Sequence, residues 1–189
     1  TFIFSHKNMK KEINRILNFW FEDCNSKDWF KKDECFDNQI KNNFGEQIEE
    51  AVLGYYNHWA KSLESSLALI ILTDQFTRNV FRGTPRSFSG DTLALNTCLH
   101  CLNTFDISQQ NREKAHFTLI PLMHSENLRI QEMSLPLFRA HTSDKVYQYA
   151  LKHKNIIARF GRFPHRNAIL GRTSTKSEIQ FLRSPGSSF

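Results

Sequence analysis

Three polar segments of the chain carry side chains that can bind a small molecule or act on it. The first, D-Q-F-T-R-N-V-F-R over residues 74–82, follows the most hydrophobic run of the sequence, residues 67–72. On a helix, Asp74 and Arg78 lie one turn apart and can form an ion pair. Because the run before them is too apolar to face water, we expect the helix to carry these groups into a cleft, with a surface ladder of ion pairs as the structural alternative. The residues that we assign here to a ligand site are Asp74, Gln75, Arg78, Asn79 and Arg82.

The second segment is the triplet H-S-E at residues 124–126. Pro121 cannot donate a helical hydrogen bond, so His124 is expected just after a kink in its helix. An imidazole, a hydroxyl and a carboxylate then follow one another, and His124 can serve as a general base with Glu126 as its orienting partner. The alternative is a histidine bonded at a helix end, with Ser125 capping the next helix.

The third segment, R-F-G-R-F-P-H-R-N, covers residues 159–167. Gly161 and Pro164 prevent a continuous helix, which leaves a rigid loop rich in cations. Guanidinium groups suit the oxygens of carboxylates and phosphates. A nucleic-acid strand would normally need a longer basic track, so a small anion or an acidic peptide end is the favoured partner. The polar residues that we assign here to a ligand site are Arg159, Arg162, His165, Arg166 and Asn167.

The overall composition limits the class of protein. Lys and Arg outnumber Asp and Glu by 25 to 19, giving a net charge of +6, but no polybasic run accompanies this excess. The cysteines at 24, 35, 98 and 101 follow neither a disulfide nor a zinc pattern, so we expect buried free thiols, no metal and no cofactor. No apolar stretch approaches the roughly 20 residues of a membrane span, and we expect a cytoplasmic location.

Helical spacing of apolar residues predicts an all-α chain with one domain over residues 9–189. Residues 1–8 are expected to be an N-terminal extension, because Met9 followed by Lys-Lys-Glu resembles a natural beginning. No segment alternates apolar and polar residues, so strands are not expected. Antiparallel helix pairs form either a bundle or a solenoid-like stack. The expected helices cover about 13–23, 36–55 after Asp33, 62–79, 91–102, 108–124, 127–138, 143–161 and a short stretch after Thr175.

The three segments, with further motifs, resemble a bacterial family known as domain of unknown function 924. The likeness runs from Ile13 to Phe189. It implies a tetratricopeptide-like stack of helices and no settled activity. The motifs that carry it are N-F-W-F at 18–21, W-F at 29–30, D-Q-F-T-R-N-V-F-R-G-T-P-R at 74–86, P-L-M-H-S-E-N at 121–127, R-F-G-R-F-P-H-R-N-A-I-L-G-R at 159–172 and G-S-S-F at the end. The chain departs from the family pattern at Thr77, Met123 and Asn127, where proline, glutamate and aspartate are usual.

Three functions are compatible with these observations. The favoured one is a binding module whose arginines and histidines line a pocket for an anion or a peptide carboxylate. The second is a hydrolase in which His124 is a general base oriented by Glu126 and the arginines stabilise an oxyanion. In the third, the carboxylate of the C-terminal tail S-P-G-S-S-F fills the basic pocket of its own chain. The oligomeric state is not predicted by any of them.

Overall fold

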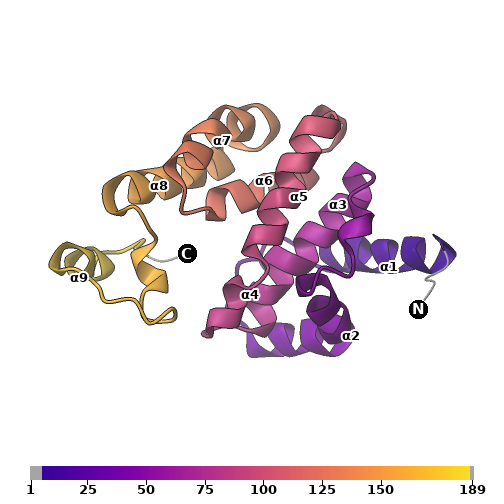
Figure 1. Cartoon of the computed structure of the whole chain (residues 1–189), viewed down its shortest axis with the longest axis horizontal. Coiled ribbons are helices and arrows are strands. Elements are labelled where there is room, and N and C mark those ends of the chain that lie inside the picture. Colours follow the sequence, from indigo (N-terminus) through magenta and orange to yellow (C-terminus); the bar gives the residue numbers. More distant parts are fainter. Residues whose placement is uncertain (1–5, 188–189) are drawn as a thin grey trace.

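In the computed structural model of the chain, residues 6–187 are described, and every regular element among them is a helix (Figure 1). The α-helices are α1 (His6–Asn18), α2 (Glu34–Val52), α3 (Leu63–Ile70), α4 (Thr77–Val80), α5 (Asp91–Thr104), α6 (Arg112–His124), α7 (Leu128–His141), α8 (Asp144–Phe160) and α9 (Lys176–Leu182). Two π-helical segments, η1 (Phe19–Asp23) and η3 (Ile71–Phe76), directly continue α1 and α3. The short 3-10 turns are η2 (Asn57–Trp59), η4 (Pro85–Phe88), η5 (Ile107–Gln109) and η6 (Pro164–Arg166). The all-α prediction is confirmed.

Local capping explains where several helices begin and end. The side chain of Asp33 accepts hydrogen bonds from the backbone N–H groups of Cys35 and Phe36, at the start of α2. Thr175 and Glu178 form a reciprocal capping box at the start of α9. Gly161 ends α8 in the left-handed conformation, with a φ of 68°. Ser62 and Ser143 cap α3 and α8 in the same way as Asp33 caps α2, so the helix boundaries expected at Asp33, Ser62, Ser143, Gly161 and Thr175 are confirmed.

Other predicted helix ends were wrong by a few residues. Helix α6 begins after Asn111, whose side chain accepts from Lys114 N, whereas Ser108 belongs to a separate 3-10 turn. Helix α7 starts after its N-cap Asn127, as predicted, but runs to His141 rather than to residue 138, and α2 ends at Val52 rather than at residue 55. Asparagine is as good an N-cap as serine, so Asn111 can take this role three residues after Ser108. The expected extension over residues 1–8 lies partly outside the described residues, and its last residues belong to α1.

Aromatic rings are concentrated in the largest of the hydrophobic clusters that form the core. Trp20 is fully buried and its ring packs edge-on against Phe76 and Phe117, at centroid distances of 5.5 Å in both pairs. The indole N–H of Trp29 donates to the carbonyl of Trp20 at 2.9 Å, which satisfies a polar group in this apolar setting. The abundance of phenylalanine therefore serves packing between α1, α2, α3 and α6. A second cluster, around Phe138, lies between α5, α6, α7 and α8.

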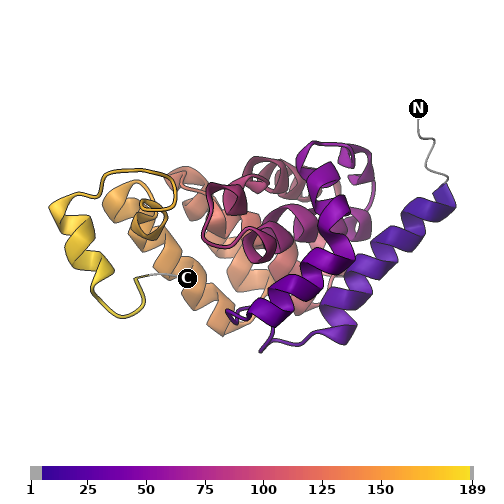
Figure 2. The same ribbon diagram turned by 90° about the horizontal axis from the view of Figure 1, so that it is seen from below.

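The helices follow one another along the long axis of the molecule. Figures 1 and 2 place α1 at one end and α9 at the other, with α3, α5 and α6 between them. Helix α6 packs against α5 and α7, and α7 packs against α8. Residues 65–77, which include η3, are all buried, so the predicted central helix is confirmed. Tetratricopeptide-like stacking stays a prediction. No helix among residues 6–187 has the length and apolar character needed to cross a membrane.

The start of α5 lies directly against the π turn of η3. A Cβ atom added at Gly90 would lie 2.0 Å from the backbone oxygen of Thr73, closer than any side chain allows. The φ of Gly90 is −95°, so space and not backbone conformation requires glycine here. This contact brings Asp91, the next residue, to the side of η3 that carries the polar segment.

We predict that Gly90→Ala lowers the free energy of unfolding by about 1–3 kcal/mol, because backbone atoms must move to admit the methyl group. Gly45→Ala is the matched control. Its added Cβ would meet only the flexible side chain of Lys41, at 3.9 Å, inside helix α2. That change should raise stability by about 0.5–1 kcal/mol through helix propensity. Urea unfolding of both variants checks the prediction, and equal stability would contradict it.

Candidate functional site

The site starts from a buried acid in the π turn of η3. Asp74 has no exposed surface, and its charge is met by several donors. Gln75 Nε2 donates to Asp74 Oδ2 at 2.6 Å, and Arg78 Nη1 lies 3.2 Å from Oδ1. The predicted pair of Asp74 with Arg78 is therefore confirmed, and Gln75 supplies a further hydrogen bond to Asp74. A π turn inserts one extra residue into a helix and is often found at functional sites.

His124, the last residue of α6, provides the third partner of Asp74. Its Nδ1 atom lies 2.8 Å from Asp74 Oδ1, across 50 positions of sequence. The carboxylate that orients His124 is thus Asp74, not Glu126 as the sequence suggested. Glu126 accepts two hydrogen bonds from Arg172, at 2.7 and 3.0 Å, and one from Phe163 N at 2.7 Å. These contacts anchor the loop after α8.

Arg166, in η6, reaches the same place from the third polar segment. Its Nη2 donates to the backbone oxygen of His124 at 3.0 Å, and its Nη1 donates to Asp91 Oδ2 at 3.4 Å. Asp91 also binds Arg78, at 2.9 and 3.1 Å. The three segments therefore meet in one group of side chains. We call this group the Asp74 cluster, and it comprises Asp74, Arg78, Asp91, His124 and Arg166.

Two phenyl rings hold the guanidinium of Arg166 in place. Its central carbon lies 4.7 Å from the ring centre of Phe88 and 4.6 Å from that of Phe163. Both distances are in the range of cation–π contacts. Phe163 is fully buried, so this side of the clamp cannot turn away without disturbing the core. The side chain of Arg166 is only 8% exposed and is fixed before any ligand arrives.

Other residues of the predicted site lie elsewhere. Arg82 and Asn79 both donate to Asp37, and Arg82 does so through two nitrogens at 2.7 and 2.8 Å. Arg162 forms a similar pair with Glu178 at 2.7 and 2.8 Å. These bidentate pairs join distant segments of the chain and fix its tertiary structure.

The remaining predicted residues have local partners. Arg159 lies over the rings of Phe160 and Phe181, at 4.7 and 5.9 Å. Asn167 Nδ2 donates to Ser174 Oγ at 3.0 Å. Ser125 Oγ accepts from the backbone N–H of Asn127 at 3.2 Å, and the ring of His165 lies beside that of Phe163.

Sequence reasoning missed two members of the arrangement. Asp91 was assigned only to the start of a helix, and Phe88 to no role at all. The motif D-Q-F-T-R-N-V-F-R-G-T-P-R stops two residues before Phe88 and five before Asp91. The three segments contain more arginines than acids, and buried arginines need carboxylate partners. This surplus could have indicated that a carboxylate from elsewhere, such as Asp91, joins the site.

Burial and mutual contacts shift the ionisation of the cluster. Burial raises the pKa of Asp74, but Arg78 and His124 outweigh it and hold that pKa well below its usual range. Burial, with Arg78, lowers the pKa of His124 in spite of the opposing effect of Asp74. Burial and the neighbouring Arg78 also lower the pKa of Arg166 to about 10. At neutral pH Asp74 is therefore ionised, Arg166 keeps its charge and the imidazole of His124 is neutral.

Further histidines lie buried around the cluster. Burial lowers the pKa of His116 and of His165 to about 4, and that of His153 to about 3. The ring of His153 lies 6.4 Å from that of His124, and its Nδ1 is 2.7 Å from the backbone oxygen of Tyr149. These residues are neutral at physiological pH and fill space next to the site.

The cysteines are free thiols, as predicted, and three of them are buried. Cys35 is the exception, because it lies exposed at the start of α2. Burial raises the pKa of Cys24 to about 12 and raises that of Cys98 and Cys101 as well. Among the described residues, no group of three or more His, Cys, Asp or Glu side chains is arranged to hold a metal ion.

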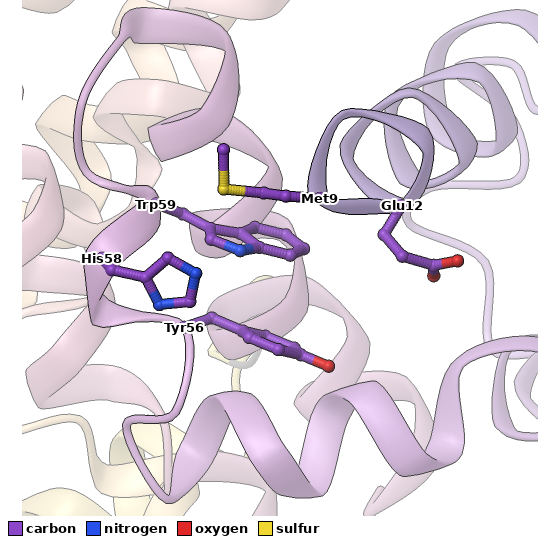
Figure 3. A pocket seen from close by; sticks show the side chains of 5 residues that line it. All are labelled: Met9, Glu12, Tyr56, His58 and Trp59. Atoms are coloured by element: carbon purple, nitrogen blue, oxygen red, sulfur yellow. The ribbon is translucent and has the colours of Figure 1, made fainter. Parts of the chain in front are cut away.

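Two cavities lie away from the Asp74 cluster. One of about 10 Å³, enough for a single water molecule, is lined by residues of α1 and of the turn around η2. Figure 3 shows the ring planes of Tyr56 and Trp59 stacked beside it, with Glu12 projecting from α1. The other, of about 200 Å³, runs along α8 beside Lys145 and Lys152. Neither cavity is lined by a residue of the Asp74 cluster. The cluster is therefore identified as a candidate site by the convergence of its side chains and not by a cavity.

Comparison with known proteins places the chain in a family. A family model described as bacterial protein of unknown function, DUF924, matches residues 16–186, and the chain belongs to this family. The structure is similar to that of a protein of unknown function, ATU0120, from Agrobacterium tumefaciens. The two share 32% sequence identity with a TM-score of 0.87, over 93% of this chain and 98% of the other. No curated protein matches the sequence.

The buried histidines give a testable dependence of stability on pH. The pKa of His153 falls from 6.5 to about 3 in the folded chain, so the unfolded chain binds the extra proton below pH 6.5. Its contribution is complete above pH 6.5 and is lost as the pH falls toward 3. We predict that His153→Asn, which keeps a donor for Tyr149, reduces the loss of stability between pH 6 and 4.5 by about 1.4 kcal/mol for each pH unit.

Denaturant unfolding at a series of pH values measures this slope. The general loss of packing in the variant affects all pH values alike and does not change the slope. His58→Asn, at an exposed position, is the matched control. A His153→Asn variant with the same slope as the unaltered chain would show that His153 takes up a proton in the folded state.

Proposed function

We propose that the chain is a binding module for a small anionic group, a carboxylate or a phosphate, which is held at the Asp74 cluster by Arg166 with Arg78 and His124. The observation that carries this proposal is the state of the Arg166 side chain. Each of its terminal nitrogens makes one hydrogen bond, and the buried Nε atom has no partner among the described residues. A guanidinium group has five N–H donors, so Arg166 has more donors than acceptors.

The electrostatics of the cluster favour the same ligand class. The oxygens of Asp74 already accept from Gln75 and lie against Arg78 and His124. Arg166 is left with Asp91, at 3.4 Å, as its carboxylate partner in the cluster. Burial, together with the neighbouring Arg78, lowers the pKa of Arg166 in spite of the nearby acids, so a further negative charge beside this side chain would be favourable. An incoming anion would relieve both the unmet donors and the repulsion between the guanidinium groups.

The clamp of Phe88 and Phe163 supports binding in a further way. A flexible arginine loses conformational entropy when it is fixed by a ligand. The guanidinium of Arg166 is already held between two rings, so little of that loss remains when an anion binds.

The proposed site contains fewer residues than the one expected from the sequence. Arg82, Arg159 and Arg162 are engaged elsewhere, so they do not contribute to it. Three residues of the cluster remain partly accessible, Asp91 with 24%, Arg78 with 20% and His124 with 16% of the side chain exposed. A single carboxylate or phosphate group fits this small set of donors better than an extended acidic peptide does.

We predict that the chain binds inorganic phosphate or succinate. Arg166→Gln should raise the dissociation constant at least about 10-fold. Titration calorimetry of both anions measures it. Arg159→Gln removes the same charge from an exposed position that forms no ion pair with any residue of the described part of the chain, and it should bind as the unaltered chain does. Circular dichroism verifies that each variant is folded. Binding that is equal in both variants, or that is absent in the unaltered chain, would contradict the proposal.

The tail hypothesis requires a separate comparison. The terminal carboxylate falls on residues 188–189, which lie outside the described residues. Removal of these two residues leaves Ser187, whose hydroxyl donates to Leu182 O, in place. If the tail occupies the cluster, the shortened chain should bind phosphate more tightly than the full chain and should melt at a lower temperature. Unchanged affinity and melting temperature would exclude that role for the tail.

A further inference from the structure

We infer that His124, positioned by Asp74, is a general base that activates water to hydrolyse a carboxylic ester whose anionic group is held by Arg166. This inference rests on the proposed function, because the anion-binding group is what would place the ester beside the imidazole. It replaces the pairing of His124 with Glu126 that the sequence suggested. Three features of the cluster carry it, namely the hydrogen bond to Asp74, the environment of the ring, and the link to Arg166.

The hydrogen bond with Asp74 selects one form of the imidazole. Asp74 is fully buried and ionised, so it can only accept, and His124 Nδ1 must carry the proton at 2.8 Å. The neutral ring then has its lone pair on Nε2. Nε2 has no hydrogen-bond partner among the described residues. A carboxylate that fixes a histidine through Nδ1 and leaves Nε2 open is the arrangement that general-base catalysis requires.

Asp74 is itself held firmly enough to act as a positioning residue. Gln75 Nε2 donates to its second oxygen at 2.6 Å, and Arg78 lies 3.2 Å from the first. The end of α6 is fixed as well, because Gln131 Nε2 donates to the carbonyls of Met123 and Ser125, at 2.6 and 2.8 Å. The imidazole is therefore anchored both through its ring and through its backbone.

The surroundings keep the base in its active form. Burial and Arg78 lower the pKa of His124, so the ring is unprotonated at neutral pH. The groups that face it are Asp74 from η3, Arg78 from α4, His116 from its own helix, His153 from α8, and His165 with Arg166 from η6. A neutral base beside guanidinium donors can accept a proton from water while those donors stabilise developing negative charge.

Arg166 joins the base to the proposed anion site. Its Nη2 donates to the backbone oxygen of His124 at 3.0 Å, while its unpaired Nε lies on the same guanidinium. An anion bound to Arg166 would thus be kept at a fixed distance from the imidazole. Such positioning of reactants lowers the entropy cost of the chemical step.

The reaction uses only water and the ester. Nε2 takes one proton from water as the water oxygen bonds to the acyl carbon, and the carbonyl oxygen becomes an oxyanion near the N–H groups of Arg78 and Arg166. The oxyanion then re-forms the carbonyl, and the bond between the acyl carbon and the leaving oxygen breaks. The leaving oxygen takes the proton from Nε2, which restores the neutral ring. The products are a carboxylic acid and an alcohol or phenol, with no change of oxidation state.

Two matched pairs of esters test the inference. The probes are 3- and 4-acetoxybenzoate, whose acetyl esters carry a carboxylate, and the methyl ester of each, which lacks that charge. We expect saturable release of hydroxybenzoate, followed by absorbance, with a kcat/KM at least about 10-fold higher for the charged esters. His124→Asn keeps an N–H donor for Asp74 but removes Nε2, so it should lose about 100-fold or more in kcat/KM. His58→Asn, at an exposed position, should retain full activity.

A second readout does not depend on turnover. Nitrogen-15 NMR of the imidazole at pH 7 should show His124 with its proton on Nδ1 and none on Nε2. A proton on Nε2 would overturn the inference, because that nitrogen could then not accept one from water. The pH profile of kcat/KM should rise with deprotonation of His124 and reach its plateau by pH 7. A profile that still rises above that pH would also count against it.

The outcomes separate this inference from the proposed function. Calorimetry with 3- and 4-hydroxybenzoate measures binding of the anion alone. Binding without hydrolysis of either ester would overturn the general-base role and leave the binding module intact. Absence of both binding and hydrolysis would overturn both. Equal hydrolysis of charged and methylated esters would overturn the role of Arg166 in placing the substrate.

Discussion

The structure depends most on the compensation of one buried charge. Burying an ionised carboxylate is strongly unfavourable unless donors surround it. Asp74 lies in the middle of the most apolar helix of the chain, with no contact to solvent. Gln75 and Arg78 come from its own helical segment, but His124 must come from the end of another helix. Helices α3 and α6 are consequently fixed to each other at that level by a polar contact inside the apolar core.

From Asp74 the polar contacts continue as a closed circuit. Arg78 connects Asp74 to Asp91, Asp91 connects to Arg166, and Arg166 returns to the backbone of His124. The circuit passes through η3, the start of α5, η6 and the end of α6, so it brings together elements far apart in sequence. The absence of a side chain at Gly90 is what allows the start of α5 to join it. The close packing at Gly90 and the ion pairs of Asp91 thus hold the start of α5 in the same position.

Local features of this fold could be predicted from the sequence, and distant pairings could not. The cap at Asp33, the capping box at Thr175 and the left-handed end at Gly161 each depend on residues within a few positions of one another. The convergence of Asp74, His124 and Arg166 was anticipated because all three segments were polar among apolar surroundings. The partners of the other arginines could not be predicted. Arg82 pairs with Asp37, and Arg162 with Glu178, because of tertiary packing that no spacing rule encodes. The π turn could not be recognised from the spacing of apolar residues either, because residues 65–77 are buried throughout.

The contrast among the cysteines has a practical consequence for work on this protein. Three thiols are buried with raised pKa values, so at neutral pH they are protonated and shielded from reagents. Cys35 alone lies at the surface among them, two residues after Asp33, which caps α2. A maleimide dye or spin label should therefore attach at one defined point without any engineered substitution. The attached reporter would follow the movement of α2 in solution while the core stays chemically untouched.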